Sequence, residues 1–355
     1  MRRREFMLAA LGTSALPYLA PLPSYAKTPA GAAIPYGAAV RTDPLYDDPA
    51  YKKAILDHCQ IIVGEGGLKW IDLRPDRHIF DFTQPDRQLA FAEEHGLEMR
   101  GHTLAWYGAM PEWTETIASA EEARFELVSH IETVVGRYKG RIRSWDVCNE
   151  PIADHPTREE PIRDSVWQRH LGRDYIELAL RTTARADPDA RLVINDYDLE
   201  QATDAGRAKR KALLDLVRDL KARDVPLHAV GLQGHLRPDI AIDRAGLTAL
   251  VAEIAAMDLG VLVTELDVID ESLPGPVAER DAAVAAVAKE FLEAIGAAAR
   301  PEAVLTWGIS DRFTWVPIWF TRGDGMPNRP LPLDSDYQKK PMMQVIEDFT
   351  RSFDR

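Results

Sequence analysis

The chain has 355 residues, of which 46% are hydrophobic and 28% charged, and its formal net charge at neutral pH is −13. This composition is typical of a soluble globular protein with a full core, built either as one large α/β domain or as two smaller domains. The acidic charge argues against nucleic acid and against anionic membrane surfaces as partners.

Residues 1–26 have the features of an export signal. Arg2, Arg3 and Arg4 precede an apolar run from Leu8 to Leu22, which is followed by the small-x-small cleavage site Ser24-Tyr25-Ala26. The paired arginines resemble a bacterial twin-arginine signal. An amphipathic anchor is a weaker alternative, because a glycine and a proline interrupt the apolar run. We therefore expect a signal peptide over 1–26, a mature chain over 27–355, and a periplasmic or extracellular location.

The chain contains only two cysteines, Cys59 and Cys148. Export would allow them to form a disulfide, but Cys148 falls inside a predicted central strand. We therefore interpret both as small buried hydrophobic side chains, with the disulfide as the alternative. No Cys/His cluster has zinc spacing and no oxygen-rich metal loop is evident, so neither a metal nor a cofactor is expected.

Short apolar runs alternate with helical patterns along the mature chain. The runs are Tyr36–Val40, Gln60–Gly64, Glu98–Leu104, Ile142–Cys148, Arg191–Asn195, Ala229–Gln233, Val261–Thr264 and Val304–Trp307. Helical spacing of apolar residues occurs in Leu127/Ile131/Val134/Tyr138, Leu213/Val217/Leu220, Leu247/Leu250/Val251/Ile254 and, behind Pro341, Met342/Val345/Ile346/Phe349.

The strands are continuous apolar runs and do not alternate with polar residues, which predicts a parallel sheet covered on its faces. Eight such βα units predict a closed (β/α)₈ TIM barrel, and the absence of a linker-like segment predicts a single domain. A doubly wound open sheet is the alternative, although no glycine-rich dinucleotide fingerprint follows the first run.

Two of the predicted strands run directly into a glutamate. Glu150 follows Trp145-Asp146-Val147-Cys148-Asn149, and Glu265 follows Val261-Leu262-Val263-Thr264. A solvated strand end would explain either residue alone. Together, two carboxyl groups at the same edge of one sheet are what glycoside hydrolysis requires.

The other strand ends carry polar and aromatic residues as well. Because barrel enzymes bind substrate at the C-terminal ends of their strands, we expect these side chains to share one site. They include Glu65, Lys69, His102, Trp106, Asn149, Tyr197, Gln233, His235, Asp267 and Trp307.

Several spaced blocks resemble glycoside hydrolase family 10, the endo-β-1,4-xylanases. They include Gly101-His102-Thr103-Leu104-Ala105-Trp106, Trp145-Asp146-Val147-Cys148-Asn149-Glu150, Gly231-Leu232-Gln233-Gly234-His235, Thr264-Glu265-Leu266-Asp267 and Trp307-Gly308-Ile309-Ser310-Asp311. The resemblance covers roughly residues 34 to 350. It implies an exported, retaining endo-xylanase that acts on xylan or xylo-oligosaccharides, and we expect the protein to be a monomer.

The resemblance also implies roles for the residues at the strand ends. Glu150 would be the general acid/base and Glu265 the nucleophile. Around them, Asn149 would bind the sugar 2-OH, His235 backed by Asp267 would orient Glu265, and Lys69, His102 and Gln233 would bind hydroxyls. Trp106, Trp307 and Trp315 would stack on sugars, with packing as the alternative for Trp315; Glu65 would bind the next sugar on the non-reducing side, and Tyr197 would line the leaving-group side.

Two positions depart from the family pattern. Gly66 stands where an asparagine is usual, and Tyr107 stands where a histidine is usual. These departures leave open a second enzyme hypothesis, in which the site prefers another β-linked glycan or a short aryl glycoside. A third hypothesis is a sugar-binding module without catalysis, although binding alone does not require two carboxyl groups.

Overall fold

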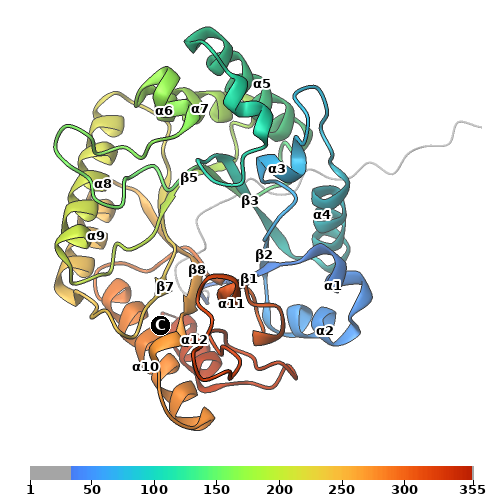
Figure 1. The fold of residues 1–355 in the computed structure, drawn as a ribbon, viewed down its shortest axis with the longest axis vertical. Helices are drawn as coiled ribbons and strands as arrows, with labels where there is room; N and C mark the ends of the chain where they lie inside the picture. The colour runs from blue at the N-terminus through green and yellow to red at the C-terminus, as the bar shows by residue number, and fades with distance from the viewer. Residues whose placement is uncertain (1–32, 354–355) are drawn as a thin grey trace, which may run out of the picture.

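A closed ring of parallel strands forms the centre of the molecule (Figure 1). The computed structural model describes residues 33–353, so the predicted signal peptide over 1–26 lies outside the described residues. The strands are β1 Tyr36–Val40, β2 Ile61–Gly64, β3 Glu98–Ala105, β4 Ser144–Asn149, β5 Arg191–Asp196, β6 Ala229–Leu232, β7 His235–Leu236, β8 Gly260–Val268 and β9 Val304–Thr306.

Strand pairing closes the ring. Neighbours follow the order β6-β5-β4-β3-β2-β1-β9-β8, and β6 also pairs with β8, from Ala229 opposite Gly260 to Leu232 opposite Val263. The two-residue strand β7 adds to the C-terminal end of β8. The predicted (β/α)₈ barrel is therefore confirmed, and the alternative of an open sheet is wrong because no edge of the eight-stranded ring is left unpaired.

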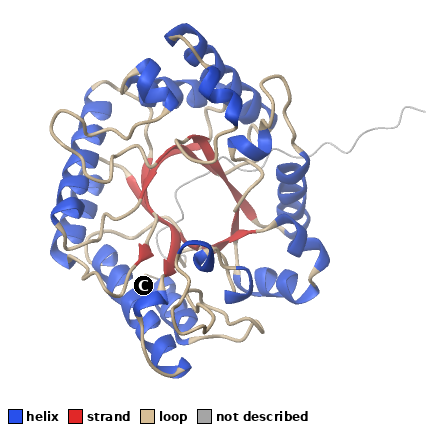
Figure 2. Cartoon of the chain, in the orientation of Figure 1, coloured by secondary structure: helices blue, strands red, loops and turns tan. Residues whose placement is uncertain are grey.

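Helices surround the ring on its outside (Figure 2). The longer ones are α2 Pro49–His58, α4 Thr83–His95, α5 Ala120–Arg137, α7 Asp174–Ala186, α8 Asp204–Ala222, α9 Arg244–Ala256, α10 Val277–Gly296 and α12 Pro341–Arg351. The short ones are α1 Thr42–Asp47, α3 Trp70–Leu73, α6 Val166–Leu171 and α11 Val316–Trp319, with 3₁₀ turns at Glu112–Thr116, Asp270–Ser272 and Asp311–Phe313.

Local sequence sets where several helices begin. Ser119 accepts a hydrogen bond from the Glu122 backbone N–H at the start of α5, and Thr203 accepts one from Gly206 at the start of α8. These side chains satisfy backbone N–H groups that have no partner within the helix. Helix α12 starts with Pro341, as predicted, because proline needs no hydrogen-bond acceptor in the first helical turn.

Two apolar cores hold the layers together. The larger one lies between the strands and the helices, and a smaller one fills the inside of the barrel. The inner core consists of Ala39, Ile61, Val63, Val193, Ala229, Leu262, Ala303, Leu305 and Trp307. The inside of the barrel is thus filled with side chains, including the buried ion pair of Arg100 and Asp146, and leaves no space for a substrate there.

Strand β8 is longer than the sequence predicted. We expected a strand over Val261–Thr264, but β8 continues to Val268, because Asp267 and Val268 pair with His235 and Leu236 of β7. Alternate residues of a strand face the same side, so Glu265 and Asp267 both turn toward His235.

Both cysteines are free and buried, which confirms their predicted role as small core residues. Burial raises the pKa of the Cys148 thiol far above its ordinary value, so this side chain stays neutral beside the site. Within residues 33–353, no helix combines the length and the apolar character needed to cross a membrane.

Candidate active site

A cavity of about 730 Å³ opens at the mouth of the barrel where the strands end. Its walls include every residue that the sequence placed in direct contact with substrate: Glu65, Lys69, His102, Trp106, Asn149, Glu150, Tyr197, Gln233, His235, Glu265, Trp307 and Trp315. The structure therefore brings together residues that are up to 250 positions apart in the chain.

Glu150 follows directly after β4 and is buried, with 8% of its surface exposed. Its backbone φ of 54° lies in the left-handed region, a strained conformation for a residue with a side chain. Trp106 Nε1 donates to Glu150 Oε2 at 2.9 Å, and Gln233 Nε2 and Asn149 Nδ2 each donate to Oε1 at 3.0 Å. Burial raises the pKa of Glu150, and the charge of Glu265 adds to the increase, although the donors offset part of it.

Glu265 lies on β8 and is equally buried, but its carboxyl group is surrounded by stronger donors. Asn195 Nδ2 donates to Oε1 at 2.6 Å, and His235 Nε2 lies 3.2 Å from Oε2. Burial alone would raise the pKa of Glu265, but the hydrogen bond from His235, the electrostatic effect of His102 and the Asn195 amide outweigh it and lower the pKa to about 2.

A chain of partly buried contacts holds His235 against Glu265. The Nδ1 atom of His235 lies 2.9 Å from Asp267 Oδ1, and Trp315 Nε1 donates to Asp267 Oδ2 at 2.7 Å. Burial disfavours a charged imidazole, but the two carboxylates outweigh burial and hold the pKa of His235 well above its ordinary value. The cationic ring can then donate to both carboxylates, which fixes its orientation.

Two asparagine side chains connect the carboxyl groups. Asn195 Nδ2, which contacts Glu265, also donates to Asn149 Oδ1 at 2.8 Å, and Asn149 in turn donates to Glu150. The pKa of one carboxyl group is therefore raised and that of the other lowered, at the same mouth of the barrel. This pairing suits a reaction that needs an acid and an anion at once.

The family model for glycosyl hydrolase family 10 matches residues 25–349 of the chain. The chain belongs to glycosyl hydrolase family 10. It is accordingly an enzyme, a glycoside hydrolase, and the alternative of a sugar-binding module without catalysis is wrong.

Relatives of this family-10 hydrolase agree in sequence and in fold. The chain is 31% identical to the beta-1,4-xylanase of Dictyoglomus thermophilum, with 84% of each chain covered. It is 35% identical to endo-1,4-beta-xylanase A of Humicola insolens, covering 80% of this chain and 72% of that one. The crystal structure of xylanase 10B from Thermotoga petrophila in complex with xylobiose superimposes with a TM-score of 0.81, at 29% identity over 91% of this chain and 95% of that one.

The inner wall of the family-10 site combines a lysine with aromatic rings. Lys69 Nζ lies 5.2 Å from the centre of the Trp106 ring and 5.5 Å from that of Trp307. His102 Nδ1 lies 3.0 Å from Asp146 Oδ2, which orients the imidazole beside Trp307. Trp106 and Trp315 have a second function besides any stacking, because each indole N–H donates to a carboxylate of the site.

At the edge of the cavity, the predicted contacts have protein partners. Glu65 accepts two hydrogen bonds from Arg41, at 2.8 and 3.0 Å. The Tyr197 hydroxyl contacts Arg163 at 2.8 Å and Asp154 at 2.5 Å. The ion pair of Glu65 and the hydrogen bonds of Tyr197 orient these side chains before a substrate arrives.

The two departures from the family pattern lie beside these residues. Gly66 has no side chain that could contact a sugar, and its backbone carbonyl accepts a hydrogen bond from Gln88 Nε2 at 3.3 Å. The Tyr107 ring packs under the Arg163 guanidinium, 4.6 Å away. Burial and the negative charge of Glu150 raise the pKa of Tyr107 to about 12, so it remains a neutral phenol.

The sequence did not predict Asn195 or Arg163 as site residues. Asn195 was recognisable as a polar strand end, but its contact with Glu265 depends on pairing between strands that are far apart in the chain. Arg163 Nε donates to the Glu150 carbonyl at 2.9 Å from an irregular loop, where no periodic pattern places it. Among the described residues, no group of three or more His, Cys, Asp or Glu side chains is arranged to hold a metal ion.

Proposed function

We propose that the protein is an endo-β-1,4-xylanase that hydrolyses internal bonds of xylan or xylo-oligosaccharides with retention of configuration. The observation that carries the proposal is the pair Glu150 and Glu265, whose pKa values are shifted in opposite directions within one cavity. Two of the relatives, a beta-1,4-xylanase and an endo-1,4-beta-xylanase A, support xylan as the substrate.

In the first step, the Glu265 carboxylate attacks the anomeric carbon while Glu150 gives its proton to the departing glycosidic oxygen. The bond from the anomeric carbon to that oxygen breaks, and a covalent ester to Glu265 forms. His235 favours the ionised form of Glu265, and Asn149 is placed to bind the 2-OH of the reacting sugar, an interaction that strengthens as positive charge develops.

In the second step, Glu150 acts as a base. It has become a carboxylate and removes a proton from water, whose oxygen attacks the anomeric carbon and releases Glu265. Two inversions at one carbon give net retention. The charge on Glu150 is supported at this stage by the donors Trp106 and Gln233.

The direct test is release of reducing ends from xylan by the purified mature protein. We expect release by the wild type and a loss of several orders of magnitude in Glu265→Ala, because no ester can form. Glu132→Ala, an exposed residue on α5, serves as the matched control and should retain activity. Failure of the wild type to release reducing ends, or equal release by Glu265→Ala, would refute the proposal.

Gly66 and Tyr107 support a second candidate, a preference for another β-linked glycan or a short aryl glycoside, because Tyr107 lines the cavity and Gly66 lines an adjacent pocket that shares Glu65 with it. Aryl β-xyloside, β-cellobioside and β-glucoside compared at equal concentration distinguish the two. Dominant turnover of the glucoside would replace xylan as the main substrate.

We further propose that residues 1–26 export the enzyme, which then acts as a monomer outside the cytoplasm. The paired arginines support this route. Replacing Arg3 and Arg4 by lysine should keep the protein in the cytoplasm, as fractionation would show. Export of this variant at the wild-type level would contradict a twin-arginine signal, and size-exclusion chromatography tests the monomer.

A further inference from the structure

We propose that Trp319, at the end of α11, is an outer sugar-binding platform on the leaving-group side of the cleft. The inference rests on the proposed xylanase function, because it requires a β-linked chain in the cavity. Arg237 and Phe320 line the same cavity.

The exposure of Trp319 is unusual for such a large apolar side chain. It is 75% exposed, and yet it lines the same cavity as the two catalytic glutamates. The preceding Ile318 is 68% exposed but does not line the cavity. An indole face open to a polar cavity can stack on the C–H face of a sugar ring, as aromatic side chains do on other apolar surfaces.

The position of Arg237 and Phe320 indicates the leaving-group side. The Arg237 guanidinium stacks 5.3 Å from the centre of the Phe320 ring, and Arg237 follows β7, which continues from β6. In the closed ring, three strands separate β6 from β2 in either direction. Glu65 follows β2, so the part of the wall formed by Arg237 and Phe320 lies across the mouth of the barrel from Glu65. Glu65 is the expected contact of the non-reducing side, which leaves Trp319 for the opposite end of the substrate.

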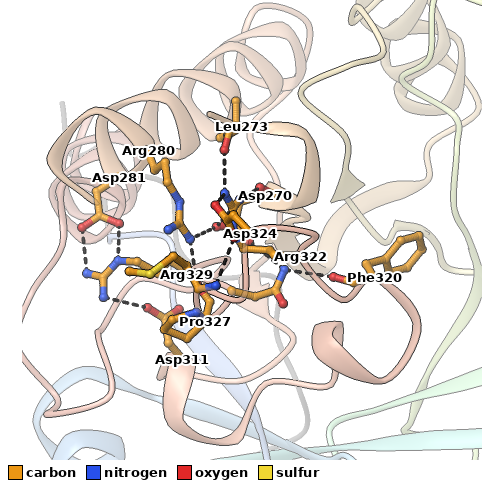
Figure 3. A network of polar contacts seen from close by, with 12 residues as sticks. Asp270, Leu273, Arg280, Asp281, Asp311, Phe320, Arg322, Asp324, Pro327 and Arg329 are labelled. Atoms are coloured by element: carbon orange, nitrogen blue, oxygen red, sulfur yellow. Dashed lines mark hydrogen bonds and ion pairs between the residues drawn. The ribbon is translucent and has the colours of Figure 1, made fainter. Parts of the chain in front are cut away.

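The loop that carries Trp319 is fixed by a buried polar network (Figure 3). Arg322 donates to the Leu273 carbonyl at 2.9 Å and to Asp324 at 2.5 Å, and it also contacts the Asp270 carbonyl. Asn328 Nδ2 donates to the Phe320 carbonyl at 3.1 Å and to Asp270 Oδ1 at 3.0 Å.

This network connects the loop to α10 as well. Arg280 donates to Asp270 Oδ2 at 2.6 Å and to the Pro327 carbonyl at 2.7 Å (Figure 3). The backbone on the C-terminal side of Trp319 is therefore ordered before a substrate binds, so stacking does not have to order the loop at the expense of affinity.

The test uses xylohexaose labelled at its reducing end and the variants Trp319→Ala, Trp319→Phe and Ile318→Ala of the full enzyme. In Trp319→Ala we expect kcat/KM for xylohexaose to fall roughly three- to tenfold, about the contribution of one aromatic contact. The labelled fragment should become shorter, because binding modes that place fewer sugars on the leaving-group side become more populated. Trp319→Phe should keep most of the wild-type kcat/KM and fragment length, because it keeps an aromatic ring. Ile318→Ala, on the same loop, should match the wild type.

Three results would overturn the inference: unchanged fragment lengths in Trp319→Ala, longer labelled fragments, or an equal effect in Ile318→Ala. Longer fragments would place Trp319 on the non-reducing side. If the wild type did not cleave xylohexaose, the proposed function would fail first. If the wild type cleaves it and Trp319→Ala gives the same fragments, only the inference fails.

Discussion

Glu150 and Glu265 show how neighbours give one residue type two chemical states. Both side chains are buried, so desolvation raises both pKa values. The difference lies in the donors, because Glu265 has a cationic imidazole at 3.2 Å whereas Glu150 has only neutral amides and an indole. The neighbours of Glu265, His235 above all, therefore shift its pKa in the direction opposite to that of Glu150, which suits the proposed roles of nucleophile and acid.

The pH dependence of kcat/KM follows from these shifts. The proposed mechanism needs Glu150 protonated and Glu265 ionised, so activity should fall as pH rises through the raised pKa of Glu150 and, on the acid side, as pH falls toward about 2. In Asn195→Ala the ionised form of Glu265 loses a 2.6 Å donor, so the acid limb should move to higher pH. A pH-rate profile measures both limbs, and an acid limb unchanged by Asn195→Ala would contradict this assignment.

Trp315 is the second residue whose role can be tested directly. Trp315→Phe keeps an aromatic ring but removes the 2.7 Å hydrogen bond to Asp267, which holds His235. A lost hydrogen bond to a buried charge costs about 1.5–3 kcal/mol, so we expect kcat to fall at least about tenfold. A change confined to KM would show that Trp315 acts by stacking alone.

At the scale of elements, the end of β8 shows what the sequence could and could not predict. The apolar run before Glu265 predicted the strand and the position of Glu265 at the mouth of the barrel. The extension through Asp267 was missed because it depends on pairing with β7, a two-residue strand with no pattern of its own. The sequence likewise placed Trp106 and Trp315 in the site but not the directions of their N–H groups.

The loop after α11 offers a prediction on stability. Arg322 is buried and paired, so Arg322→Met removes one donor from the backbone carbonyls of Asp270 and Leu273 and one charge from beside the Asp270 carboxylate. Breaking a buried pair from one side typically costs about 3–5 kcal/mol, and we expect a loss near the lower limit because Arg280 still contacts Asp270. Chemical unfolding measures the change.

Arg207→Met is the matched control for this variant. Arg207 is exposed and pairs only with Asp204 of its own helix, so its loss should change the free energy of unfolding by less than about 1 kcal/mol. Equal losses in the two variants would contradict a structural role for the network in Figure 3.

At the scale of the whole molecule, the prediction of the fold depended mainly on the apolar runs. Eight non-alternating runs predicted the parallel barrel, and the barrel rule then predicted that the strand ends meet. The Arg322 network could not be predicted, because its partners are about 50 residues apart and lie in loops without periodicity. The spacing of apolar residues does not show which charged side chains will be buried.

A buried carboxyl group away from the catalytic pair should make stability depend on pH. Burial, together with the charge of Asp198, raises the pKa of Glu200 from 4.5 to about 7. The folded state then binds the proton more tightly than the unfolded state, so this contribution to stability is complete below pH 4.5 and is lost as pH rises to about 7. Glu200→Gln should remove that loss.

We expect Glu200→Gln to be more stable than the wild type at pH 8, by roughly 2–3 kcal/mol, with no gain at pH 4. Thermal unfolding at the two pH values measures the difference, and Glu132→Gln on the surface of α5 is the control. An equal gain at both pH values would mean that the effect does not come from the proton on Glu200.

The configuration of the first sugar released tests the central claim most directly. Proton NMR of xylohexaose hydrolysis, recorded before the anomers equilibrate, identifies the new reducing end. If Glu265 forms an ester and Glu150 returns the proton, the β-anomer appears first and the α-anomer grows in later. Initial formation of the α-anomer would mean a single displacement by water, and the roles assigned to Glu150 and Glu265 would be wrong.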